Sequence, residues 1–150
     1  MLLKRAEKKF KLATRDYAQL ASFRHALRGF VRFSEAAAAQ EGLTSQHYQA
    51  MLILRGWPEG QPLSINELAQ QLLIKHNSAV GLVDRLAEVG LVMREPSSVD
   101  RRKVELRLTP RGRQVLGKLA QMHRSELRRI GPLMKRFFSE LTHEEPGSAP

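Results

Sequence analysis

The sequence contains no cysteine, and this absence excludes several kinds of chemistry at once. A chain without thiols forms no disulfides, uses no thiolate nucleophile, binds no zinc through cysteine and senses no oxidant through a thiol. Aromatic residues are also sparse, at 6% with a single tryptophan. Any sensing by this chain must therefore use side chains other than cysteine.

Long apolar runs are missing as well. Residues 50–54 form one of the longest, and it is far too short to cross a bilayer. The first nine residues carry charges where a signal peptide needs its apolar segment. We therefore expect a soluble, intracellular protein of the cytoplasm.

Signatures of enzymes and metal sites are not found either. The five histidines show neither an HExxH motif nor a pairing at i and i+4, so a zinc site would have to be assembled across separate elements. There is no nucleophile elbow, phosphate-binding loop or catalytic pair of carboxylates. We expect no enzymatic activity, no metal and no cofactor.

Positive charge, by contrast, is abundant. The chain has 25 Lys and Arg against 15 Asp and Glu, which gives a formal charge of +10 and a pI near 10.7. This balance favours a polyanionic partner, with nucleic acid first. A membrane surface is the weaker alternative, because the cations are not confined to one helix face opposite Trp and Leu.

The length of 150 residues predicts one domain, and its first half reads as helical. Apolar spacings of three and four, without proline, predict a long helix from about Lys4 to Glu41, ended by Gly42. Thr44 is then suited to cap a helix that runs through Arg55.

Two short helices follow. Ser64 and Glu67 form a capping box that opens the first of them. The second begins between residues 75 and 77 and runs to Val89, with Gly90 after its end. Two short helices joined by a tight turn predict a helix-turn-helix.

A basic hairpin comes next. Residues 91–93 and 104–108 read as strands, and the tip between them carries Arg101, Arg102 and Lys103. A basic hairpin behind such a helix pair predicts a winged helix-turn-helix over about residues 43–110. The expected fold class is mainly α with a small β-hairpin wing.

The C-terminal part predicts further helices. Thr109 and Pro110 form a strong helix start, Gly131-Pro132 is expected to break or kink the helix, and a last short helix follows. The tail 143–150 is expected to be disordered. The segments 4–41 and 110–141 carry surplus apolar residues, which either pack together within one chain or, as we favour, form an intertwined dimer interface.

Several short motifs together resemble the MarR family of regulators, named for multiple antibiotic resistance. The likeness covers about residues 20–140. It rests on Leu43-Thr44, Leu68-Ala69, Val83-Asp84-Arg85-Leu86, Gly90-Leu91-Val92, Asp100-Arg101-Arg102 and Leu108-Thr109-Pro110-Arg111-Gly112. The resemblance implies a homodimer that binds pseudo-palindromic DNA, usually as a repressor, and that is often released by a small aromatic or phenolic ligand.

A helix that enters the major groove presents its first turn to the base edges. Here that turn is Lys75, His76, Asn77 and Ser78. Asn77 can bond an adenine edge, Ser78 a base or phosphate, and Lys75 a phosphate or guanine. Helix capping is the alternative role for Asn77 and Ser78. Gly81, one turn later, would let the helix approach DNA closely or is merely tolerated.

In the wing, the resemblance implies that Arg102 enters the minor groove and that Asp100 supports the wing. A narrow minor groove concentrates negative potential that a guanidinium can occupy. Arg101 and Lys103 would then contact phosphates; the alternative is a solvated basic loop. Arg94 and Arg107, on the strands, are phosphate neighbours or outward-facing charges.

An effector site is also implied by the resemblance, in the cleft between the first helix and the winged part. Its candidate residues are His25, Arg28, His47, Met51 and Trp57. Arg24, Arg28 and Arg32 form a stripe on the first helix, which is either a solvated face or an anion site.

Two further functions compete with a ligand-responsive DNA-binding repressor. A winged helix can also bind RNA or protein, and a chain of this charge can act as a constitutive architectural DNA-binding protein. The polar first turn and the Asp100-Arg101-Arg102 tip favour duplex DNA.

Overall fold

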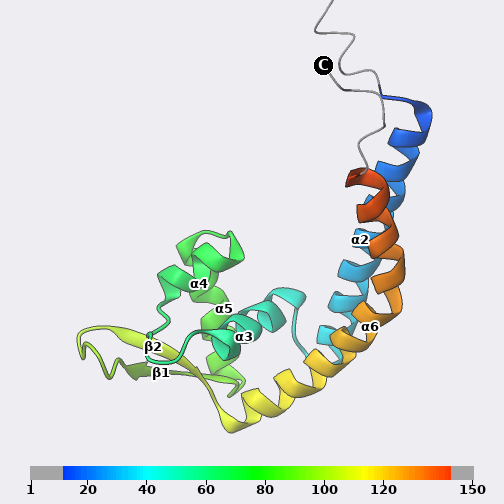
Figure 1. Ribbon diagram of the computed structural model, residues 1–150. Helices are drawn as coiled ribbons and strands as arrows, with labels where there is room; N and C mark the ends of the chain where they lie inside the picture. The colour runs from blue at the N-terminus through cyan, green and yellow to red at the C-terminus, as the bar shows by residue number, and fades with distance from the viewer. Residues whose placement is uncertain (1–11, 143–150) are drawn as a thin grey trace, which may run out of the picture. The chain divides into compact units, whose positions relative to one another are not determined.

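The computed structural model describes residues 12–142, and within them the fold is mainly helical. Five helices and one antiparallel hairpin follow one another along this part of the chain (Figure 1). Their bounds are α2 Thr14–Gln40, α3 Ser45–Gly56, α4 Ile65–Leu72, α5 His76–Glu88, β1 Val92–Pro96, β2 Val104–Leu108 and α6 Pro110–Thr142. The predicted fold class is confirmed.

These elements group into two compact units. One consists of residues 33–125 and contains α3, α4, α5 and the hairpin. The other joins the first part of α2, up to Arg32, to the part of α6 from Glu126 onward. The first unit is called the winged unit below, and the second the helical unit.

The winged unit is held by an apolar core to which the three short helices and both long helices contribute. Its fully buried side chains include Met51 of α3, Leu68 of α4, Leu86 of α5 and Leu119 of α6. Burying side chains of this size contributes roughly 1.5–3 kcal/mol each. This core fixes the helix pair and the base of the wing in one body.

The predicted capping box at Ser64 is present, and the predicted N-cap Thr44 forms a second capping box with His47. The Thr44 hydroxyl accepts from the His47 amide at 3.3 Å, and the Ser64 hydroxyl accepts from the Glu67 amide at 3.2 Å. In turn, the Glu67 carboxylate accepts a hydrogen bond from the Ser64 amide at 2.7 Å. Each box satisfies amides that a helix start otherwise leaves without partners.

The hairpin agrees closely with its prediction. β2 covers the predicted residues, whereas β1 begins one residue later than predicted and extends to Pro96. The strands pair in register from Val92 with Leu108 to Pro96 with Val104. The Leu106 amide also donates a hydrogen bond to the Leu63 carbonyl at 3.0 Å, outside the hairpin.

The start of α2 differs from the prediction. Residues 12 and 13 are not helical, and the helix begins at Thr14 rather than near Lys4. The Ala13 amide donates to the Asp16 carboxylate at 2.7 Å, which closes the helix start there. The predicted stretch 4–11 and the predicted disordered tail 143–150 lie outside the described residues.

Of the predicted break or kink at Gly131-Pro132, the break and the separate last helix are wrong, because α6 runs on through Pro132 to Thr142. The proline removes one backbone hydrogen bond, but packing supports the turns that follow. Phe23 of α2 meets Phe137 and Phe138 edge to face, with ring centroids 6.0 and 5.7 Å apart. Tertiary contact here outweighs a local breaker.

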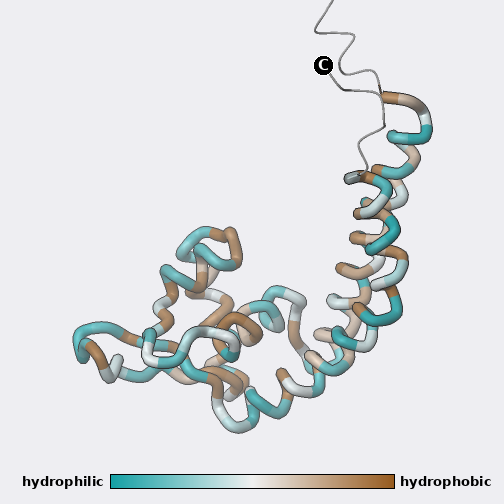
Figure 2. The backbone as a smooth tube through the Cα atoms, in the orientation of Figure 1, coloured by the Kyte–Doolittle hydropathy of each residue, from teal (hydrophilic) through white to brown (hydrophobic). Residues whose placement is uncertain are grey.

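The helical unit leaves many apolar side chains in contact with solvent. Hydrophobic and hydrophilic residues alternate along α6 (Figure 2). Exposed apolar residues of this unit are Leu12, Tyr17, Leu20, Val31, Leu127, Leu133, Phe138 and Leu141. Part of the apolar surplus therefore packs within the chain, through Phe23 and Phe137, and part remains uncovered.

Candidate nucleic-acid interface

The first turn of α5 is fully available to a partner. Lys75 is the N-cap residue, and it makes no side-chain capping bond. His76, Asn77 and Ser78 follow it as the first helical residues, and all four are exposed. Asn77 and Ser78 are therefore not the helix cap, which leaves their hydrogen-bonding groups free for another role.

The wing tip is built on one buried hydroxyl. Ser97 is 1% exposed, and its Oγ accepts from the amides of Val99 and Asp100 at 3.2 and 3.4 Å. The Ser97 amide donates to the Lys103 carbonyl at 2.8 Å. The tip is thus an ordered turn, and sequence reasoning did not assign Ser97 this role.

Asp100 and Arg102 are neighbours within this tip. The Asp100 Oδ1 accepts from the Arg102 amide at 3.1 Å and lies 3.4 Å from the Arg102 Nε. The Arg102 side chain is 92% exposed, and Arg101 and Lys103 are exposed beside it. The carboxylate fixes the backbone while the guanidinium extends into solvent.

The two strand arginines are already paired. Arg94 donates to Asp84 of α5, and Arg107 lies within 3.0 Å of Glu95 and 2.7 Å of Glu105. The hydrogen bond from Arg107 to Glu105 raises the pKa of this guanidinium above its usual value. These pairs tie the wing to itself and to α5 rather than offering free charge.

The junction of the wing with α6 is tight. The Thr109 hydroxyl donates to the Gly90 carbonyl at 2.7 Å and accepts from the Gly112 amide at 2.9 Å. A side chain at Gly112 would place its Cβ 2.0 Å from the Leu91 carbonyl oxygen. The Thr-Pro-Arg-Gly motif therefore has a structural purpose: it seats α6 against the strand that leads into the wing.

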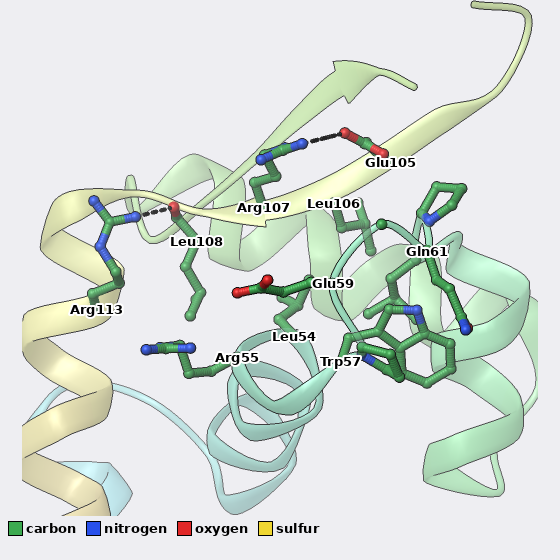
Figure 3. A pocket seen from close by; sticks show the side chains of 14 residues that line it. Leu54, Arg55, Trp57, Glu59, Gln61, Glu105, Leu106, Arg107, Leu108 and Arg113 are labelled. Carbon is green, nitrogen blue, oxygen red and sulfur yellow. Dashed lines mark hydrogen bonds and ion pairs between the residues drawn. The ribbon is translucent and has the colours of Figure 1, made fainter. Parts of the chain in front are cut away.

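A pocket of about 450 Å³ lies on the same unit, behind β2. Arg55, Arg113 and Leu108 lie on one side of the view in Figure 3, and Trp57 and Gln61 lie on the other. Arg113 donates to the Leu108 carbonyl at 3.1 Å. The Trp57 Nε1 is buried and finds no acceptor among the described residues.

The five predicted effector residues are divided between the two units. Of these, Trp57 lines the pocket, whereas His47 and Met51 are buried in α3 and do not line it. The His47 Nδ1 accepts from the Thr44 amide at 3.0 Å, so this side chain caps a helix. Burial and then the charge of Arg85 lower its pKa, which keeps the ring neutral for that bond.

His25 and Arg28 belong to the helical unit and are exposed on α2. The arginine stripe to which Arg28 belongs is exposed at all three positions. The pocket lining was not predicted, because Arg55, Arg107 and Arg113 come from three elements whose meeting the sequence pattern does not reveal.

Sequence reasoning also assigned no role to His123, which is buried. The His123 Nδ1 donates to the Leu119 carbonyl at 2.7 Å, and Nε2 lies 2.8 Å from the Ser34 hydroxyl. The ring stacks on Tyr48 with centroids 4.0 Å apart. The sequence signal for this position was the spacing of four residues between Leu119 and His123 on one helix face. Because both ring nitrogens have hydrogen-bond partners, we assign His123 a structural role.

Comparison with known proteins finds similarity to one family of regulators. The sequence model of the MarR family matches residues 41–103 of this chain. A protein assigned to transcriptional regulation of the hcr operon in Thauera aromatica is 32% identical over 103 residues, which span 69% of this chain and 56% of that protein. The crystal structure of RV1404 from Mycobacterium tuberculosis is 25% identical, has a TM-score of 0.66, and is matched over 93% of this chain and 97% of its own.

Over these stretches the chain is similar to proteins of the MarR family, and its fold is that of MarR family structures. A further relative, the transcriptional activatory protein BadR of Rhodopseudomonas palustris, is 29% identical over 77% of this chain and 65% of its own length. The chain thus spans between half and two thirds of the length of these curated relatives.

No helix between residues 12 and 142 is long and apolar enough to cross a membrane. Over the same range, no three acidic or histidine side chains gather closely enough to hold a metal ion.

Proposed function

We propose that this chain is a sequence-specific regulator of transcription that binds double-stranded DNA as a homodimer. The observation that carries the proposal is the pairing, on one compact unit, of two uncovered polar surfaces. These are the first turn of α5 and the wing tip with its extended Arg102. A helix for the major groove and an arginine for the minor groove together suit duplex DNA.

The same two surfaces also favour this proposal over its alternatives. A protein-binding module would expose apolar residues at the first turn of α5, where this chain exposes Lys75, His76, Asn77 and Ser78. A constitutive architectural protein would need the charge but no particular sequence. Selection from a pool of randomised duplexes tests the proposal: we expect one enriched inverted repeat, with half-sites about 10 base pairs apart. Recovery of unrelated duplexes would favour the architectural role.

We expect Arg102→Ala to weaken binding to the selected duplex by about 1–3 kcal/mol, because it removes the minor-groove contact. The fold should persist, since the exposed pair with Asp100 contributes little and the Arg102 amide keeps its bond to that carboxylate. Fluorescence anisotropy measures the change. Arg24→Ala is the control, because Arg24 is equally a surface arginine but lies on α2. Equal small losses from both variants, at unchanged folding, would contradict the wing assignment.

The sign of regulation is proposed as repression, with release by a small aromatic or phenolic ligand. The pocket behind β2 supports the second part, because its volume suits a small molecule and Trp57 offers an indole N–H without an acceptor in the described chain. Leu54, Leu106 and Leu108 supply apolar lining. A ligand there would press on the strand that leads to the wing tip.

The ligand site can be tested directly, because Trp57 is the only tryptophan of the sequence. Phenol and benzoate serve as probes, and we expect saturable quenching of its fluorescence together with weaker DNA binding. Trp57→Phe should leave DNA binding intact but reduce the response to the probe. DNA binding that the probe weakens equally in this variant would place the ligand elsewhere.

A further inference from the structure

The turn between α4 and α5 contains a conformation that its residue does not favour. Leu73 follows the last residue of α4 with φ 56° and ψ 40°, in the left-handed region. Elsewhere in the described chain a positive φ is found at Gly42, Gly60 and Gly90. This backbone shape turns the chain so that the Ile74 amide donates back to the Ala69 carbonyl at 3.1 Å, which closes the end of the helix. Glycine would take this shape with less strain.

The Leu73 side chain adds almost no buried apolar surface that would offset this strain. It is 92% exposed, which makes it the most exposed of the large apolar side chains in the described chain. A single exposed leucine is ordinary on a protein surface. An exposed leucine that also strains the backbone is not explained by stability.

At Gly81 the chain has a glycine where a residue with a side chain would stabilise the helix. It lies inside α5, one turn after Asn77 and on the same face, and a Cβ built on it meets no atom within 4 Å. Alanine would therefore fit within the chain and would favour the helix. At both positions the sequence departs from the residue that would stabilise the fold.

We infer that both residues are shaped by contact with DNA, which rests on the function proposed above. Leu73 supplies an apolar contact to a thymine methyl at the edge of the major groove, and the bare Gly81 lets that face of α5 approach the groove closely. The position supports this assignment, because Leu73 comes directly before the exposed segment from Lys75 to Ser78. The thymine methyl is the apolar group that the major groove presents.

The first test is thermal stability. Leu73→Gly, Leu73→Asn and Gly81→Ala should each raise the melting temperature by about 2–4 °C, because each removes strain or a helix-weakening residue. Gly117→Ala is the matched control for the glycine: it lies inside α6, is exposed and also has no atom within 4 Å of an added Cβ. It should gain a similar stability.

The second test is affinity for the duplex selected by the wild-type chain. Leu73→Gly, Leu73→Asn and Gly81→Ala should each lose about tenfold, whereas Leu73→Met keeps the apolar contact and stays within about twofold. Gly117→Ala and Leu52→Ala, the latter at an exposed leucine of α3, should bind as the wild type does. Since no charge changes, the salt dependence should be the same for all.

A third test locates the contact. Replacing thymine by uracil at one position of each half-site removes only the methyl, and at the contacted position it should weaken the wild type severalfold without further weakening Leu73→Gly. A wild-type chain that binds its duplex no better than Leu73→Gly overturns this inference alone. A wild-type chain that selects no duplex overturns the proposed function, and the inference with it.

Discussion

Gly112→Ala is expected to destabilise the winged unit by at least about 3 kcal/mol, the largest loss of folding stability that we predict. The added Cβ would lie 2.0 Å from the oxygen and 3.0 Å from the carbon of the Leu91 carbonyl. Both atoms are backbone, so a side-chain rotation cannot relieve the clash. The first turn of α6 would have to leave the strand and break the bond from Thr109 to the Gly90 carbonyl.

Urea unfolding measures this loss, and Gly117→Ala on the same helix is its control. Nothing lies within 4 Å of a Cβ at Gly117, so that variant should be as stable as the wild type or up to about 1 kcal/mol more stable. If Gly112→Ala unfolds within about 1 kcal/mol of the wild type, the seating of α6 against Leu91 is wrong.

Leu133→Glu is expected to weaken association of two chains by several kcal/mol, because it would bury a carboxylate without a partner in the proposed dimer interface. In the single chain the same change should be tolerated, since Leu133 is 37% exposed. The expected result is therefore a folded monomer with reduced DNA affinity. This combination distinguishes loss of the dimer from loss of the fold.

Sedimentation equilibrium measures the association, with circular dichroism as the check on folding. Ser139→Glu is the control, because Ser139 is an exposed polar residue of the same helix. A wild-type chain that sediments as a monomer at micromolar concentration, yet protects a two-fold symmetric site on DNA, would defeat the dimer proposal.

Sequence reasoning worked best where the signal is local. The N-cap at Thr44, the capping box at Ser64, the turn at Gly90 and the second strand were all found from residues within a few positions of one another. Each depends on a hydrogen bond or a backbone angle that neighbouring residues decide.

It failed where distant packing decides. The proline at position 132 does not end α6, because the turns after it pack on Phe23, more than a hundred residues earlier. His47 caps α3 from a buried position, a role that its sequence context did not indicate. Neither outcome could be foreseen from periodicity, since each depends on which elements meet in space.

The candidate interface falls between these cases. The first turn of α5 and the wing tip were predicted by residue, and the structure leaves both uncovered. What the sequence did not indicate is the buried Ser97 that supports the wing tip and the left-handed backbone of Leu73 before α5. Both are conformational facts, and neither leaves a compositional pattern.

The most direct test of the proposed function is affinity for the selected duplex and for a scrambled duplex, measured by fluorescence anisotropy across a salt series. The account predicts at least about a thousandfold preference for the selected duplex near physiological salt. It also predicts a slope of log affinity against log salt on the order of −5 or steeper, given the formal charge of +10. Equal affinity for the two duplexes, or a slope near zero, would contradict it.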